Sequence, residues 1–263
     1  MPTIARVTAA LETIAPLSLA ADWDAVGLLV GPRRQEIARV MTCLSLTEET
    51  AAEAVRERAD LVVTHHPLPF RPVSRITDES PVGRVLLDLV GAGIGVWSSH
   101  TAWDSAAGGI NDQLAALLGL EHVAPLERSP LHPPSGLGRV GTAPAGWSVE
   151  RLARHAADRL AAGGVQVSGD AARPAGRVGI ICGSGGDALA QAVAAECETF
   201  LTGEIRLHQT IEARAAGLAV IAVGHHASER FSLDALARRL AEAVAGLTCW
   251  ASRDETDPLR WLG

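Results

Sequence analysis

The feature that most constrains the fold is the alternation of short β-branched apolar runs with helical segments along the 263 residues. The runs typical of buried strands are Leu61 to Thr64, Ile94 to Ser98, Val178 to Cys182 and Leu218 to Val223. Helical segments of about 10–15 residues separate most of them, which is typical of parallel sheets covered by helices. The sequence therefore predicts an α/β protein with mostly parallel sheets flanked by helices.

Several helices are predicted from their starts. Apolar residues from Ile4 to Ile14 recur at helical spacing, and Thr47 precedes two glutamates that favour the first turn of a helix. Ser80 before a proline, Asn111 and Ser232 are expected to begin three more. These starts lie between the predicted strands, in agreement with the α/β prediction.

The stretch from Pro125 to Gly138 is rich in proline, serine and glycine and has no periodicity. Such composition is typical of a linker. We therefore expect two α/β lobes, an N-terminal lobe over residues 1–125 and a C-terminal lobe over residues 126–263.

Composition excludes several classes of protein. Hydrophobic residues make up 48% and charged residues 20%, and no apolar run approaches the roughly 18 residues that span a bilayer. The 23 basic residues are spread along a chain of net charge −7, which argues against nucleic acid as a partner. The four cysteines are far apart, and the first residues do not resemble a signal peptide. We expect a soluble cytoplasmic protein with reduced cysteines and no membrane partner.

Histidines and carboxylates gather just after three of the predicted strands. His65 and His66 follow the first strand, and His100 and then Asp104 follow the second. The last strand leads through a glycine into His225, His226 and Glu229. Ligands of open α/β sheets bind beyond the carboxyl ends of strands, so these side chains are expected to converge.

One histidine at a strand end is more often a hydrogen-bonded structural residue than a ligand, but three such ends are hard to explain in that way. Imidazole nitrogens together with carboxylate oxygens suit zinc, iron, manganese, nickel or cobalt. Because two adjacent histidines point in different directions, His65 and His66 could serve separate ions. We expect two divalent transition-metal ions on His65, His66, Asp104, His225 and Glu229.

Two further segments are weaker candidates. Glu204 ends another predicted strand and His208 follows four residues later, so the pair could provide a general base or contact substrate. A helix-capping carboxylate and a surface imidazole explain them equally well. The glycine-rich stretch Gly183–Gly186 could cradle a phosphate, although a plain tight turn is the simpler interpretation.

Taken together, the motifs resemble the Nif-three-like family, whose members are also called GTP cyclohydrolase I type 2 homologues. The resemblance runs in order from about residue 20 to residue 230. It rests on the segments DWDAVGLLVG (22–31), THHPLPF (64–70), HTAWDSAAGGIND (100–112), CGSGG (182–186), TGE (202–204) and GHHASER (224–230). The paired-histidine and GHHASE motifs are specific, and the glycine-rich motif is not.

The resemblance implies a dinuclear metal site in a two-lobed α/β protein assembled as a ring-shaped homohexamer. It implies the ligands His65, His66, Asp104, His225 and Glu229, with Glu229 bridging the ions and His100 nearby. Ala25 and Ala102 stand where family members usually carry asparagine, which leaves the substrate open.

Two functions remain open from the sequence. The first is a metal-dependent hydrolase acting on a small molecule such as a nucleotide or phosphoester, because metal-bound water is a strong nucleophile near neutral pH. The family name suggests opening of the purine ring of GTP. The second is a metal-binding scaffold or regulatory ring protein without turnover.

Overall fold

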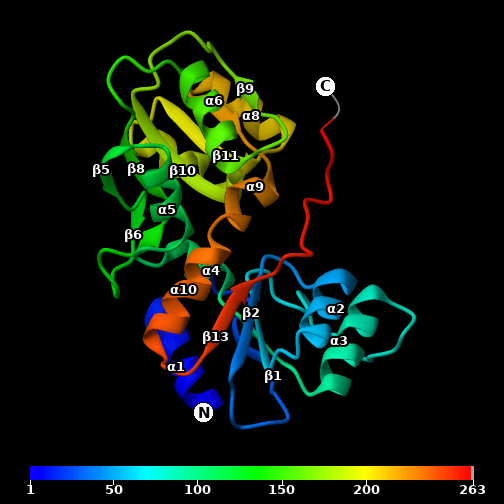
Figure 1. Ribbon diagram of the computed structural model, residues 1–263. Coiled ribbons are helices and arrows are strands. Elements are labelled where there is room, and N and C mark those ends of the chain that lie inside the picture. Colours follow the sequence, from blue (N-terminus) through cyan, green and yellow to red (C-terminus); the bar gives the residue numbers. More distant parts are fainter. Residues whose placement is uncertain (262–263) are drawn as a thin grey trace. The chain divides into compact units, whose positions relative to one another are not determined.

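The computed structural model describes residues 1–261 and divides into two compact units (Figure 1). The first unit consists of residues 1–103 and 232–256. The second consists of residues 104–231 and 257–261. The first unit is therefore discontinuous in sequence, and the second interrupts it.

A five-stranded sheet forms the centre of the first unit. Its strands, in spatial order, are β1 (Gly27–Val30), β4 (Gly95–Ser98), β3 (Leu61–Thr64), β2 (Arg39–Cys43) and β13 (Thr248–Ala251). Only β1 is antiparallel to its neighbour, and the other pairs are parallel. The inner parallel strands β4, β3 and β2 are almost fully buried, as their continuous apolar character predicts, whereas the edge strand β13 is partly exposed.

Helices cover both faces of this sheet (Figure 1). They are α1 (Ile4–Ile14), α2 (Glu48–Arg56), α3 (Pro81–Ala92) and α10 (Leu233–Ala243), with the short 3-10 turn η1 (Leu17–Leu19) after α1. Met41, Val62 and Val96 pack against α2 and α3 in one core. The helix starts expected at Thr47 and Ser80 are confirmed, since each side chain accepts a hydrogen bond from the first turn.

The second unit is built on a six-stranded sheet of mixed direction. Its strands, in spatial order, are β5 (Glu121–Ala124), β8 (Arg139–Thr142), β10 (Arg177–Ser184), β11 (Thr199–Glu204), β12 (Ala219–Ala222) and β9 (Gln166–Ser168). The central pairs β10–β11 and β11–β12 are parallel, and the outer pairs are antiparallel. The expected parallel arrangement therefore holds only for the centre of this sheet.

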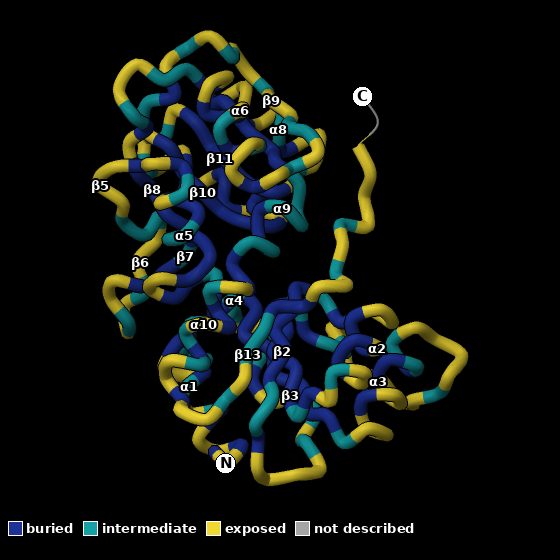
Figure 2. Tube along the Cα trace, viewed as in Figure 1, coloured by how far each residue is buried: buried dark blue, intermediate teal, exposed yellow. Residues whose placement is uncertain are grey.

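Helices also flank the second sheet. They are α5 (Ile110–Leu117), α6 (Val149–Leu160), η2 (Gly185–Ala188), α7 (Leu189–Ala194), α8 (Leu207–Ala215) and α9 (His225–Arg230). Leu189, Phe200 and Val220 belong to one core beneath α7 and α8. In Figure 2 the central strands of both sheets are coloured as buried, whereas the edge strands β5, β9 and β13 are mostly exposed or intermediate. A further helix, α4 (His100–Ser105), begins in the first unit and ends in the second.

The division of the chain differs from the single boundary expected near residue 125. Helix α10 and strand β13 return to the first unit, where β13 pairs in parallel with β2 and α10 packs on both strands. Residues 125–138 contain the small hairpin of β6 (Glu127–Arg128) and β7 (Gly136–Leu137) within the second unit. Composition identified an irregular segment there, but it could not reveal the non-local pairing of β13.

One helix start differs from expectation, because Gly109, not Asn111, precedes α5. The start of α10 at Ser232 is confirmed, although the Ser232 side chain makes no capping hydrogen bond to the helix. None of the four cysteines, all within residues 1–261, forms a disulfide, and Cys43 and Cys182 are buried. Among residues 1–261, none of the helices has the length and apolar character to cross a bilayer.

Candidate metal centre

Three histidines of the first unit gather beyond the ends of neighbouring parallel strands. His65 and His66 directly follow β3, and His100 opens α4 two residues after β4. The ring centroid of His100 lies 5.1 Å from that of His65 and 5.5 Å from that of His66. One nitrogen from each of the three rings lies within 4.8 Å of the others, so the group could hold a metal ion.

In two of these rings, Nδ1 forms a hydrogen bond with a side-chain oxygen. The Nδ1 of His66 forms a 2.8 Å hydrogen bond with Oγ of Ser45, in the loop after β2. The Nδ1 of His100 lies 2.8 Å from Oδ1 of Asp24. Metal-binding histidines characteristically have one ring nitrogen held in this way, which fixes the orientation of the other. The contact at Nδ1 therefore sets the orientation of Nε2 in both His66 and His100.

Asp24 holds His100 and Thr101 in position in the first unit. Its side chain is fully buried, and Oδ2 accepts hydrogen bonds from the backbone N–H and the hydroxyl of Thr101. Burial opposes ionisation, but the hydrogen bonds from His100 and Thr101 outweigh it and lower the pKa of Asp24. His100 itself has a positive φ of 25°, an uncommon conformation for a non-glycine residue that the surrounding contacts must hold.

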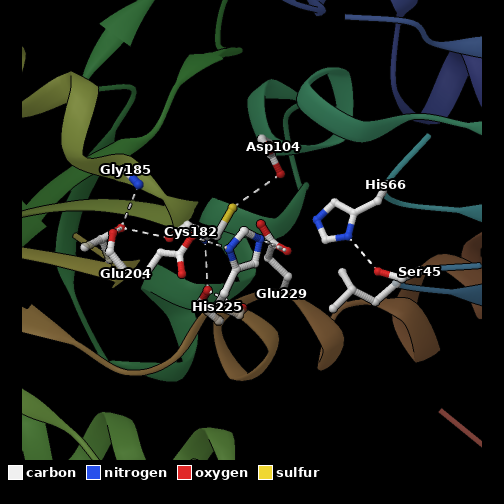
Figure 3. Close-up of polar contacts among 12 residues, drawn as sticks. Ser45, His66, Asp104, Cys182, Gly185, Glu204, His225 and Glu229 are labelled. Atoms are coloured by element: carbon white, nitrogen blue, oxygen red, sulfur yellow. Dashed lines mark hydrogen bonds and ion pairs between the residues drawn. The ribbon is translucent and has the colours of Figure 1, made fainter. Parts of the chain in front are cut away.

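The second unit carries the carboxylates of the candidate centre (Figure 3). His225 and Glu229 lie one turn apart on α9, with Nε2 of His225 3.1 Å from Oε2 of Glu229. Asp104 lies near the end of α4, and its Oδ1 is 3.3 Å from the sulfur of Cys182 on β10. The spacing of four residues between His225 and Glu229 therefore brings both side chains to one face, as the sequence indicated.

His225 is held from both sides. Its Nδ1 lies 3.1 Å from Oε1 of Glu204, at the end of β11. Burial would lower its pKa, but hydrogen bonds and charge from Glu229, and then from Glu204, raise the pKa of His225 to about 9. The carboxylates thus favour a positive charge at this ring, and a bound cation would take the place of the proton.

Cys182 and Asn111 support Asp104. Burial raises the pKa of Cys182 well above its ordinary value, and the charges of Asp104 and Glu229 raise it further. The thiol therefore remains protonated and donates to Asp104. The buried amide of Asn111 accepts from the backbone N–H of Cys182 and donates to the backbone carbonyl of Asp104, at 2.9 and 3.1 Å. The carboxylate of Asp104 is thus oriented by two residues that the metal-ligand pattern did not single out.

Glycines allow α9 to lie directly on the strand ends. A Cβ atom at Gly183, where φ is +60°, would clash with the Glu229 carboxylate, and one at Gly203 would clash with Ser228. Ser228 accepts a hydrogen bond from the N–H of Gly183, and Thr202 accepts one from Gly185, at 2.9 Å each. Because these N–H groups bond within the unit, the glycine-rich stretch is a packing turn and does not present them to a phosphate.

The structure places the predicted residues in two sets. His65 and His66 lie together with His100 in the first unit, and His225 and Glu229 lie together in the second, with Asp104 beside Cys182. Glu204 contacts His225, whereas His208 is exposed on α8. Ser45, Cys182 and Asn111 were missed as supporting residues, although Cys182 and Asn111 belong to segments that carried the family resemblance.

The comparison with known proteins decides the family. The model of the Duf34/NIF3 (NGG1p interacting factor 3) family matches residues 2–258. The chain belongs to the Duf34/NIF3 family. The predicted resemblance is thereby confirmed.

Relatives and solved structures agree with this assignment. The chain is 38% identical over 234 residues to the GTP cyclohydrolase 1 type 2 homolog of Streptomyces coelicolor, covering 87% of this chain and 82% of the relative. It is 31% identical over 253 residues to the protein of that name from Clostridium perfringens, covering 96% and 97%. The crystal structure of a Bacillus cereus protein related to NIF3 superimposes with a TM-score of 0.92 at 20% identity, over 99% of both chains, which establishes the shared fold.

The donor atoms of this Duf34/NIF3 chain fit a transition metal. Imidazole nitrogens bind zinc-like ions at about 2.0 Å, so ligands around one ion lie roughly 3–4 Å apart. One nitrogen from each of the three imidazoles of the first unit lies within 4.8 Å of the others, which is close to that spacing. Nitrogen and carboxylate donors together favour zinc, iron, manganese, nickel or cobalt over calcium or magnesium.

Proposed function

We propose that the protein is a metal-dependent hydrolase that holds two divalent transition-metal ions on His65, His66, Asp104, His225 and Glu229. The observation that carries the proposal is the hydrogen bonding of the imidazole rings. In His66 and His225 the Nδ1 atom is held by an oxygen of Ser45 or Glu204, so that Nε2 is the donor for a metal. A histidine with a merely structural role does not need this arrangement at two separate strand ends.

The remaining ligands complete the proposal. Glu229 has two carboxylate oxygens and is suited to bridge the ions, and Asp104 supplies a second negative charge. Helix α4 carries His100 in the first unit and Asp104 in the second, so a single helix links the two sets of residues covalently. Two negative charges offset part of the repulsion between the cations.

When bound, such ions lower the pKa of a coordinated water and stabilise negative charge that develops on the substrate. The chain contributes the fixed imidazoles, the carboxylates and the buried supporting contacts. Glu204 and His208 are proposed to assist proton transfer or to contact the substrate. Glu204 already has an observed role, since it holds His225.

The proposed substrate is a small molecule with a nucleotide or phosphoester group. Two metals suit displacement at phosphorus and also hydrolysis of a purine ring. The relatives are named GTP cyclohydrolase 1 type 2 homologs, which supports a nucleotide. We further propose a cytoplasmic homohexamer, and light scattering that gave a monomer at micromolar concentration would reject that assembly.

A metal-controlled activity screen tests the hydrolase. Protein loaded with zinc, iron, manganese, nickel or cobalt is assayed against nucleotides and phosphoesters, with Glu229→Gln as the blank. Metal content is measured on the same samples by elemental analysis. Turnover that rises with occupancy and disappears in the blank supports the hydrolase. Two bound ions without turnover on any compound favour a scaffold instead.

A further inference from the structure

Two large aromatic side chains remain exposed beside the histidines of the first unit. Trp23 is 67% exposed and Phe70 is 53% exposed, whereas Trp97 and Trp103 are almost fully buried. Aromatic rings contribute most to stability when buried, and exposed apolar side chains that lie together can mark a ligand-binding site.

The two rings come from separate loops and meet at one imidazole. Their centroids lie 6.2 Å apart with the planes tilted by 46°. The centroid of His100 lies 5.9 Å from Trp23 and 6.0 Å from Phe70, and its plane stands at 76° to each ring. The imidazole of His100 is therefore adjacent both to the aromatic pair and to His65 and His66.

The loop that carries Trp23 is fixed in place. The neighbouring Asp24 is buried and binds His100 and Thr101, and the N–H of Ala21 donates to the hydroxyl of Thr101 at 3.0 Å. An aromatic surface held by buried polar contacts loses little conformational entropy on binding. The exposure of Trp23 is thus a property of a rigid loop.

The spacing of the rings limits how a ligand can bind. A ring inserted between two others needs about 7 Å between them, because stacked carbons lie about 3.5 Å apart. Trp23 and Phe70 are closer than that and tilted by 46°, so a planar ligand ring stacks on the outer face of one ring and meets the other at an angle. A ring bound there lies one imidazole away from the paired histidines.

We propose that Trp23 and Phe70 form a stacking platform for the planar heteroaromatic ring of a small-molecule substrate. The inference rests on the proposed function, since it specifies which part of the substrate this side of the metal site recognises. The platform selects for compact substrates whose reacting group lies in the ring or a few bonds from it. Long, flexible substrates without a ring gain nothing from it.

Calorimetric titration of the zinc-loaded full chain tests the platform with three probes. Guanosine monophosphate carries ring and phosphate, guanosine carries the ring alone, and ribose 5-phosphate lacks the ring. Stacking on one aromatic side chain is worth about tenfold or more in affinity. We expect guanosine monophosphate to bind at least about tenfold more tightly than ribose 5-phosphate. We expect Trp23→Ala to remove that difference while ribose 5-phosphate binds as before.

Matched variants separate stacking from other effects. Trp23→Phe should retain most of the preference, and Phe70→Ala should lose part of it. Trp261→Ala removes another partly exposed tryptophan and should leave the affinity for each probe unchanged. Circular dichroism of each variant verifies the fold.

Several results would overturn the platform. The first is equal affinity of the wild type for guanosine monophosphate and ribose 5-phosphate. The second is an equal loss of affinity for both compounds in Trp23→Ala. The third is a change of oligomeric state in that variant, which would assign Trp23 and Phe70 to a contact between copies of the chain. Metal analysis separates this failure from failure of the proposed function. If the chain retains no zinc after loading but still binds guanosine monophosphate more tightly than ribose 5-phosphate, the platform is supported and the metal site is rejected. Zinc-loaded protein without a preference rejects the platform alone.

Discussion

The two units carry chemically different sets of candidate ligands. The first unit offers the imidazoles of His65, His66 and His100, and its buried carboxylate, Asp24, holds an imidazole. The second unit offers the carboxylates of Asp104 and Glu229 together with His225. The first unit therefore positions neutral donors, and the second supplies the negative charge that retains cations. Changes in the second unit should affect metal binding more than equivalent changes in the first.

The largest expected effect comes from removing charge in the second unit. Glu229→Gln retains the size of the side chain but supplies one neutral oxygen in place of a carboxylate. The affinity for one of the two ions should fall by more than the roughly 10- to 100-fold lost with a supporting residue. Elemental analysis after dialysis should find about two ions in the wild type and about one in the variant, a stoichiometry that follows from the ligand set.

The fold should survive this change, because the sheets do not depend on Glu229. Circular dichroism should remain nearly native. A Glu229→Gln protein that retained both ions tightly would show that Glu229 only pairs with His225, and the assignment of charge to the second unit would then be wrong.

The next largest effect tests how closely α9 must approach the glycine-rich turn. Gly183→Ala places a methyl group against the Glu229 carboxylate and strains a residue at φ +60°. Gly146, at φ +75°, has open space around it and provides a matched control. Gly146→Ala should lower the free energy of unfolding by about 1 kcal/mol from backbone strain alone, and Gly183→Ala by roughly 3 kcal/mol.

Urea unfolding measures both losses, and metal analysis shows whether only Gly183→Ala also releases an ion. Equal destabilisation of the two variants would mean that α9 can move aside. In that case the second unit is less rigid than the contacts of Gly183 indicate.

A smaller effect compares the residues that hold the histidines in each unit. Ser45→Ala removes the partner of His66, and Glu204→Gln replaces the charged partner of His225. Losing such a partner typically lowers metal affinity by about 10- to 100-fold. Glu204→Gln should show the larger loss, because a carboxylate makes the imidazole a stronger donor.

Competition with a chelator of known affinity measures both variants. A larger loss in Ser45→Ala would reverse the comparison and make the first unit the dominant half. If neither variant differed from the wild type, the hydrogen bonds to Nδ1 would have no influence on metal binding.

The smallest expected effect on metal binding comes from replacing Glu53, a buried residue of α2. Its carboxylate accepts hydrogen bonds from the hydroxyl of Ser252 and from the N–H groups of Arg253 and Asp254. Burial opposes ionisation, but these bonds outweigh it and lower the pKa of Glu53. Glu53→Gln should destabilise the protein by about 1–3 kcal/mol and leave metal content unchanged.

The sign of the pH dependence follows from that lowered pKa. The ionised Glu53 stabilises the fold above its unfolded pKa, about 4.5, and this contribution is lost as pH falls through the lower folded value. Urea unfolding between pH 7 and pH 3 should therefore show a steeper decline in the wild type than in Glu53→Gln. Parallel declines would mean that other carboxylates dominate acid unfolding.

The sequence predicted the strand ends well because burial and the strand period are local properties. His65, His66 and His225 all lie where the apolar runs end, and Glu229 lies one helical turn beyond His225. The contact of Cys182 with Asp104 was not predictable, since it joins residues 78 positions apart. The return of β13 to β2 was missed for the same reason, because an edge strand carries no signal that names its partner.

The discontinuity of the first unit has a consequence for the order of events during synthesis. Domains fold as units while the chain emerges from the ribosome. Residues 104–231 form a nearly continuous second unit and emerge before α10 and β13 exist. The sheet that carries His65 and His66 therefore waits with β2 as an open edge until about residue 256 has been made. The first unit begins first during synthesis and is completed last. Its unpaired strand β2 is the place where the nascent chain most needs protection from aggregation.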